Sequence, residues 1–196
     1  MSDRIEPTAR RPRADAERNR QRLLDTAKSA FAEKGTNASL DEIAKSAEVG
    51  IGTLYRHFPT RDALVEAVYR NELTQIIEAA EHLAATQPPV AALREWLLLF
   101  VDYMATKRGM SEVLNSIVGG TANLYADSGA QIKRVADALV DRAVANGDIH
   151  LQIDPMDLLR ALAGVANISA DTDWKQSARR MVEIMIAGMQ TRRETP

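Results

Sequence analysis

The sequence of 196 residues predicts an all-α fold, and three observations support this prediction. Apolar residues recur at i, i+3, i+4 and i+7 through most of the chain, which is the spacing of an amphipathic helix. Glycine, proline and short polar turns divide the chain into segments of helical length. The period-two alternation that marks β-strands is found only at 149–153, which is short and leads into Asp154-Pro155. We therefore expect helices joined by turns.

The composition narrows the possible classes of protein. Apolar residues make up 45% of the chain and charged residues 27%, which is ordinary for a globular protein. Cysteine is absent, so disulfides, thiolate nucleophiles and zinc-thiolate sites are excluded. The apolar run of the central region, 96–101, is too short to cross a membrane, and the arginine-rich N-terminus has no apolar segment like that of a secretion signal. We expect a cytoplasmic protein.

The first predicted helix covers 14–34. Its apolar stripe consists of Leu23, Leu24, Ala27, Ala30 and Phe31. Gly35 follows directly and is a typical helix stop, because glycine readily takes the left-handed conformation there.

Two short helices are predicted between residues 39 and 58. Ser39 can accept a backbone N–H at the start of the first, and Glu42 completes the pattern of a capping box. Gly50 is expected to take the positive φ of a sharp turn. A second apolar stripe follows at once, and we expect it to face the first helix; it comprises Ile51, Leu54, Tyr55 and Phe58.

The other side of the second short helix carries small side chains and hydrogen-bond donors. These are Gly52, Thr53, Arg56 and His57, with Arg61 just beyond Pro59. An exposed helix of this kind, held by a turn against a second helix, is typical of the reading helix of a helix-turn-helix unit.

The pattern continues beyond Thr60, a predicted N-cap, as one helix that ends near Gln87-Pro88-Pro89. A further helix is predicted at 90–106 and, after a break at 107–109, a short one that ends near 117. After a polar loop at 119–129, helices are predicted at 130–145, 155–169 and 173–191. We place the domain boundary inside the long helix, which gives domains 1–65 and 66–196.

Charge is distributed unevenly along the chain. Residues 1–70 carry 13 Lys/Arg against 11 Asp/Glu, whereas residues 71–196 carry 12 against 16. Residues 1–22 contain seven arginines and four acids. Such an arm can neutralise phosphates or enter a minor groove, although a solvated, frayed terminus would have the same composition.

Gly-Thr-Leu-Tyr-Arg-His-Phe at 52–58, preceded by Leu-Asp-Glu-Ile-Ala at 40–44 and followed by Arg61 and Leu64, resembles the tetracycline-repressor (TetR) family of bacterial regulators. The specific resemblance covers roughly Leu23 to Leu64, about a quarter of the chain. It implies a three-helix helix-turn-helix DNA-binding domain joined to a larger helical ligand-binding and dimerisation domain. It also implies a homodimer that binds a palindromic operator and is released by a small-molecule inducer.

The resemblance also implies roles for individual residues. Thr53, Tyr55, His57 and Arg61 would contact phosphates, and Ser39 would join them. Gly52 would let the helix backbone approach the duplex, while Ile51 and Arg56 stand at positions that vary with the operator. Arg56 is therefore the candidate for reading a base, for example guanine. For Tyr55 we expect the ring to lie in the core even if the hydroxyl contacts a phosphate. As alternatives to phosphate contact, His57 could be a packed or capping residue and Arg61 a solvated residue at a helix start.

The C-terminal part offers candidates for an inducer site and for a dimer interface. Bulky or polar residues that could line a cavity are Trp96, Phe100, Tyr103, Met104, Asn115, Tyr125 and Asn167. Stripes of the last two helices that suit a four-helix interface include Leu159, Leu162, Ala166, Met181, Met185 and Met189. Packing within one protomer is the alternative for both sets.

We therefore expect a sequence-specific transcriptional regulator, most simply a repressor, that needs no cofactor or metal. A helical DNA-binding protein without ligand control is an alternative. An enzyme would be a third possibility, but His57, His82 and His150 are scattered, and the sequence contains no phosphate-binding glycine loop, paired-histidine metal motif or nucleophile turn.

Overall fold

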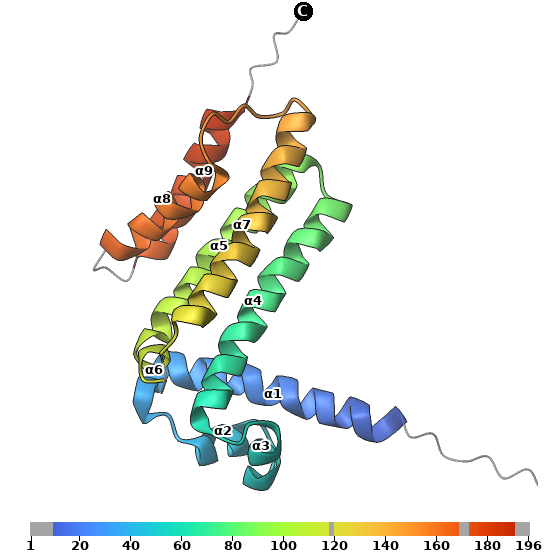
Figure 1. Cartoon of the computed structure of the whole chain (residues 1–196), viewed down its shortest axis with the longest axis vertical. Coiled ribbons are helices and arrows are strands. Elements are labelled where there is room, and N and C mark those ends of the chain that lie inside the picture. Colours follow the sequence, from blue (N-terminus) through green and yellow to red (C-terminus); the bar gives the residue numbers. More distant parts are fainter. Residues whose placement is uncertain (1–9, 118–119, 169–172, 191–196) are drawn as a thin grey trace, which may run out of the picture. The chain divides into compact units, whose positions relative to one another are not determined.

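The computed structural model describes residues 10–117, 120–168 and 173–190, and these residues are almost entirely helical. The expectation of an all-α fold is confirmed, since the only β-type pairing in the described part is an isolated bridge between Ile149 and Gln190. The helices are α1 Arg10–Lys34, α2 Leu40–Ser46, α3 Ile51–His57, α4 Arg61–Thr86, α5 Pro89–Gly109, α6 Ser111–Asn115, α7 Ala122–Ala145, α8 Pro155–Ile168 and α9 Trp174–Met189, with a 3₁₀ turn, η1, at Gly35–Asn37 (Figure 1).

Two predicted boundaries are wrong. The break expected at 107–109 lies at Met110, because α5 continues through Lys107 and Arg108 to Gly109 and α6 begins at Ser111. The polar loop expected at 119–129 is mostly helix, since α7 begins at Ala122. In both places the helix carries exposed polar residues such as Arg108 and Asp127, whose polarity reflects solvation and does not signal a loop.

Contacts divide the chain into two compact units. Unit 1 contains the chain up to Tyr69 together with Gly109–Val118, and unit 2 contains Arg70–Arg108 and Gly119–Pro196. The long helix α4 has residues in both units. Unit 1 is therefore built from two separate stretches of sequence.

In unit 1, α2 and α3 pack against α1 and against each other (Figure 1). The core contains fully buried residues from several elements, and among them Phe31 of α1, Leu54 of α3 and Leu64 of α4 are all 0% exposed. Gly35 has a φ of +55° and ends α1, as predicted. Thr60 accepts a hydrogen bond from the backbone N–H of Ala63 at 3.0 Å, which confirms it as the cap of α4.

The turn between α2 and α3 differs from the expectation. Gly50 has an ordinary φ of −70°, and the residue with positive φ is Glu48, at 56°. At a positive φ the backbone of a residue other than glycine is strained by contacts of its Cβ. The side chain of Glu48 forms an ion pair with Arg22 of α1, at 3.2 Å, so this turn carries a charged residue where its backbone favours glycine.

We expect Glu48→Gly to stabilise the protein by roughly 0.5–1 kcal/mol, because glycine adopts a positive φ without strain. The ion pair that is lost is exposed and contributes about 0–1 kcal/mol. Chemical denaturation measures the difference. Glu48→Gln, which removes the ion pair but keeps the strain, is the control and should not stabilise; a Glu48→Gly variant less stable than Glu48→Gln would contradict this account.

In unit 2, ion pairs join α5 to α9. Arg94 donates to Glu183 at 2.9 Å, and Asp102 accepts from Lys175 at 2.8 Å and from Arg179 at 2.7 Å. Partial burial raises the pKa of Asp102, but the bonds from the two cations outweigh it and leave the pKa below its usual value. The carboxylate therefore stays ionised and keeps α9 against α5.

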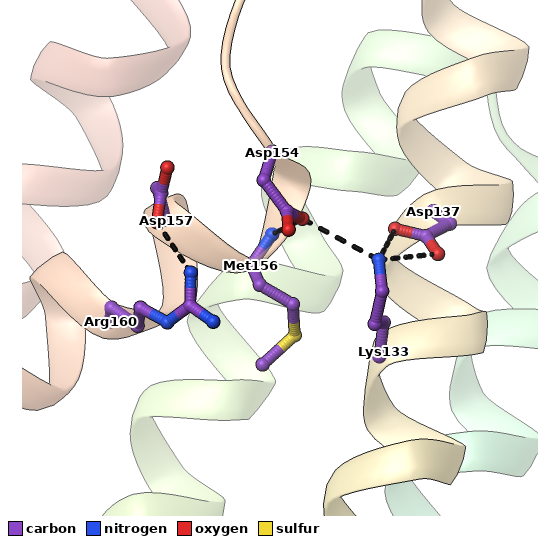
Figure 2. A network of polar contacts seen from close by, with 6 residues as sticks. All are labelled: Lys133, Asp137, Asp154, Met156, Asp157 and Arg160. Atoms are coloured by element: carbon purple, nitrogen blue, oxygen red, sulfur yellow. Dashed lines mark hydrogen bonds and ion pairs between the residues drawn. The ribbon is translucent and has the colours of Figure 1, made fainter.

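The start of α8 is fixed by a second polar network (Figure 2). Asp154 accepts the backbone N–H of Met156 at 2.9 Å, and this bond is the main reason why its pKa is lowered. Lys133 of α7 lies between Asp137, at 3.0 Å, and Asp154, at 3.5 Å. Since α8 also packs on both α7 and α9, its outer face has a defined orientation within unit 2.

Candidate nucleic-acid interface and its relatives

Helix α3 presents the surface that the sequence predicted for a reading helix. Gly52 and Arg56 are exposed, and Thr53 and His57 are partly exposed, so four of the outward-facing candidates are accessible. Arg56 lies along its own helix, with Nε donating to the Gly52 carbonyl at 3.2 Å and a terminal nitrogen donating to the Thr53 hydroxyl at 2.8 Å. These four residues make this part of the face polar.

The apolar stripe of α3 is only half buried, which corrects the prediction. Leu54 and Phe58 are buried, at 0% and 3% exposure, whereas Ile51 is 37% exposed and Tyr55 49%. The expectation of a Tyr55 ring in the core is therefore wrong. Both Ile51 and Tyr55 add apolar area to the outward face, where a thymine methyl or a sugar is a suitable contact.

The buried side of α3 fixes the orientation of this face. Leu54 and Phe58 belong to the core of unit 1, and the guanidinium of Arg20 lies over the Phe58 ring, 5.6 Å from its centroid. The imidazole of His57 is tilted against the same ring at 6.1 Å. Rigid support of this kind keeps a reading helix in register with its binding site.

The N-terminus of α2 lacks the predicted capping box. Ser39 is the N-cap residue, but its side chain makes no capping hydrogen bond. Glu42 binds Lys34 of α1 at 2.7 Å, and this bond lowers the pKa of the carboxyl. Ser39 is half-buried.

Arg61 lies elsewhere than expected for a phosphate contact. Its guanidinium donates to three backbone carbonyls, those of Ala38 at 2.6 Å, Thr36 at 2.9 Å and Gly35 at 3.4 Å. It also stacks over the Phe31 ring, 5.1 Å from the centroid. Sequence reasoning could not find this role, because the acceptors are backbone atoms.

The basic arm is only partly described. Arg4 lies outside the described residues, and no side-chain positions are described for Arg10, Arg11 and Arg13. Of the later arginines, Arg18 pairs with Asp15 and Arg22 with Glu48, both at exposed positions. Exposed pairs of this kind are weak, so these arginines can exchange partners at low energetic cost.

Family models match both parts of the chain. The model of bacterial regulatory proteins of the tetR family matches residues 23–68, which include α2 and α3. A model of the C-terminal domain of SbtR-like transcriptional regulators matches residues 88–191. The chain belongs to the TetR family. It is thus a DNA-binding transcriptional regulator with a helix-turn-helix.

Solved structures of TetR proteins are similar over nearly their full length. A TetR regulator from Streptomyces coelicolor is 40% identical, with a TM-score of 0.80 over 88% of this chain and 99% of that one. A TetR regulator from Mycobacterium vanbaalenii is 31% identical, with a TM-score of 0.71 over 91% of this chain and 99% of that one. An HTH-type transcriptional regulator from Staphylococcus aureus is 29% identical over 77% of this chain and 81% of the relative.

Two further findings concern other classes of function. None of the helices in the described part of this TetR protein is long and apolar enough to cross a bilayer. Within the same residues, no group of three or more His, Cys, Asp or Glu side chains is placed to hold a metal ion.

The candidate inducer residues fall into two groups. Trp96, Phe100 and Tyr103 are buried in unit 2 and form a chain of ring contacts, with centroids 6.0 Å apart in both steps. The Trp96 Nε1–H donates to the carbonyl of Ile76 at 3.0 Å. Met104 is partly buried on the same helix.

The polar candidates differ from these rings in their exposure and location. Asn115 is exposed on α6 and belongs to unit 1, and Asn167 is exposed in the last turn of α8. Tyr125 lies on α7, and Lys107 lies over its ring, 4.1 Å from the centroid. The three aromatic residues of α5 therefore form a buried cluster, whereas both amides are exposed.

The candidate dimer residues lie mostly inside the protomer. Leu159, Leu162 and Ala166 of α8 are at most 3% exposed and Met189 of α9 is 8% exposed, whereas Met181 and Met185 are partly exposed. The exposed apolar residues of these helices are Ile168, at 87%, and Ile184, at 64%. Most of the stripe that the sequence offered for a dimer interface therefore faces the protomer's own core, which was the alternative for these residues.

Proposed function

We propose that this TetR protein is a homodimeric repressor that binds a palindromic operator through α3 and is released by a small-molecule inducer. The observation that carries the proposal is the outward polar face of α3, with Gly52 and Arg56 exposed above the buried Leu54. A single α3 covers only a few base pairs, whereas two copies about 34–36 Å apart read successive turns of one face of a duplex.

For DNA contact, we propose Thr53, Tyr55, His57 and Ser39 as phosphate ligands and Ile51 and Arg56 as readers of base edges. To bind guanine, Arg56 must exchange its bonds to Gly52 and Thr53 for the O6 and N7 atoms of the base. Both bonds are solvent-exposed, so the exchange is energetically inexpensive.

For dimerisation, we propose the outer stripe of α8 and α9. It consists of Ala161, Gly164 and Ile168 on α8, and Ile184 and Gly188 on α9. A Cβ added at Gly164 or at Gly188 would meet nothing within 4 Å, so the protomer itself does not require glycine at either position. Glycine in a helix costs about 1 kcal/mol relative to alanine, and closely packed helices of a second copy would account for its use.

Ile184→Arg should convert the dimer into a monomer and reduce operator affinity by at least about a hundredfold, because it places a charge in an apolar interface and separates the two reading helices. Sedimentation and DNA-binding titrations measure the two effects. Ile153→Arg is the matched control, since Ile153 is 53% exposed but lies outside the stripe. A fully dimeric Ile184→Arg variant would rule out this interface.

For the inducer, we propose a site in unit 2 beside Trp96, Phe100 and Tyr103. The Phe100 and Tyr103 rings, packed on the buried Trp96, would supply the apolar walls that most ligand sites have, and the Tyr103 hydroxyl adds a polar group. An inducer releases the operator only if it binds the free conformation more tightly than the DNA-bound one.

The experiment that tests the proposal begins with random duplexes selected by the purified protein. The selected sites should be palindromic, and their binding should persist with competitor DNA and moderate salt, which remove purely electrostatic contacts. Compounds are then screened for release of a selected duplex. Failure to enrich any sequence would overturn the proposal, and enrichment without inversion symmetry would overturn its dimeric form.

A further inference from the structure

The feature that carries a further inference is the guanidinium of Arg61, the first residue of α4. It lies over the Phe31 ring and donates to the carbonyls of Ala38, Thr36 and Gly35. Both terminal nitrogens are used, one on Ala38 and the other on the two earlier carbonyls. The side chain is partly buried. All of these contacts lie within unit 1.

The three acceptors are carbonyls of a helix end. Gly35 and Thr36 belong to η1, directly after α1, and Ala38 precedes Ser39, the N-cap of α2. Carbonyls at the end of a helix are often bound by arginine or lysine, and here the carbonyl of Gly35 also accepts the backbone N–H of Ala38 at 3.3 Å. Arg61 therefore connects the end of α1 with the start of α2.

This connection also closes the helix-turn-helix at its base. Ala38 and Arg61 are 23 positions apart, and α2, the turn and α3 all lie between them. A bond between the two ends of this segment restricts its movement relative to α1. The bond from Arg61 to Ala38 thus acts on the segment that carries the reading helix.

We propose that Arg61 is a positioning residue for DNA binding: it fixes the base of the helix-turn-helix and does not bind phosphate. The three carbonyls take both N–H groups of one terminal nitrogen and one of the other, so a phosphate could not be bound end-on by the two terminal nitrogens together without breaking one of these bonds. Lysine would keep the charge but could not reproduce the planar fork that reaches several acceptors at once. The proposal depends on DNA binding through α3, but its first test needs no DNA.

The first test is hydrogen exchange of the free protein. Arg61→Lys and Arg61→Gln should both accelerate exchange over residues 35–47 by roughly tenfold, the factor expected when about one hydrogen bond to a charged group is lost. Exchange in α7 reports global unfolding and should not change. Unchanged exchange over residues 35–47 in both variants would overturn the proposal, because a phosphate ligand has no role in the free protein.

The second test uses a DNA duplex selected by the wild-type protein and the salt dependence of its binding. Each phosphate contact contributes about 0.9 to the slope of log affinity against log salt. A positioning role predicts that Arg61→Lys and Arg61→Gln lower the affinity about tenfold and leave this slope unchanged. Arg134→Lys, on the exposed side of α7, is the matched control and should have no effect.

The opposite pattern would identify a phosphate ligand. In that case Arg61→Lys would retain wild-type affinity and Arg61→Gln would reduce the slope by about one. Either result would overturn the positioning role. If the wild-type protein selects no duplex, the operator proposal fails, and the exchange experiment still decides whether Arg61 fixes residues 35–47.

Discussion

Gly52→Leu should abolish operator binding and leave the free protein as stable as the wild type. A Cβ at this position meets nothing within 4 Å, so the fold accommodates a side chain. Leucine is also the better helix former, by up to about 1 kcal/mol. In the complex, the new side chain would hold the α3 backbone away from the duplex and weaken several contacts together. Since one disturbed base pair costs about 1–3 kcal/mol, we expect at least a loss of about a hundredfold.

The experiment pairs thermal unfolding with titration of a selected duplex. Gly129→Leu on α7 is the matched control, because a Cβ at Gly129 also meets nothing within 4 Å and this residue lies in unit 2. Gly52→Ala should give an intermediate affinity. If Gly52→Leu binds the duplex as the wild type does, α3 does not approach DNA through this face.

Trp96→Ala should destabilise the protein by about 3–5 kcal/mol, the range found when large aromatic residues are removed from a core. Trp96 is 0% exposed, stacks on Phe100 and donates to the Ile76 carbonyl of α4. Trp96→Phe keeps most of the apolar volume but loses the hydrogen bond, for which we expect about 1–3 kcal/mol. Urea denaturation measures both values.

Leu99→Ala on the same helix is the control, since Leu99 is 41% exposed and surface changes usually stay within about 0.5 kcal/mol. The size of the Trp96→Ala effect also separates two roles of this residue. A tryptophan that lines an open cavity has fewer packing partners, so a loss below about 1 kcal/mol would favour a cavity wall over a core residue.

Several features set by neighbouring residues were predictable from the sequence, although the capping box of Ser39 and Glu42 was not. Helix stops and caps such as Gly35 and Thr60 depend on local backbone geometry, and both were predicted correctly. The buried stripe containing Leu54 followed from helical periodicity. The reading helix was recognisable for the same reason, because its pattern is contained in one short segment.

Features that depend on distant parts of the chain were not predictable. The exposure of Tyr55 depends on where α1 and α2 lie. The positive φ was expected at Gly50 but occurs two residues earlier, at Glu48. The bonds of Arg61 go to backbone carbonyls, which have no signature in a sequence. For α8, periodicity identified an apolar stripe around Leu162 but could not say that it faces its own protomer.

The stretch Gly109–Val118, which belongs to unit 1 although it follows α5, affects how this regulator can be re-engineered. Met110, Val113 and Leu114 are at most 1% exposed and are assigned, with Gly109–Val118, to the same unit as α1, α2 and α3. Gly109 lies so close to α1 that an added Cβ would be 3.4 Å from that of Ala32. A chimera that exchanges operator specificity by transplanting only the residues before α5 would join α6 to a foreign surface. Transplanting α6 along with them keeps this packing native.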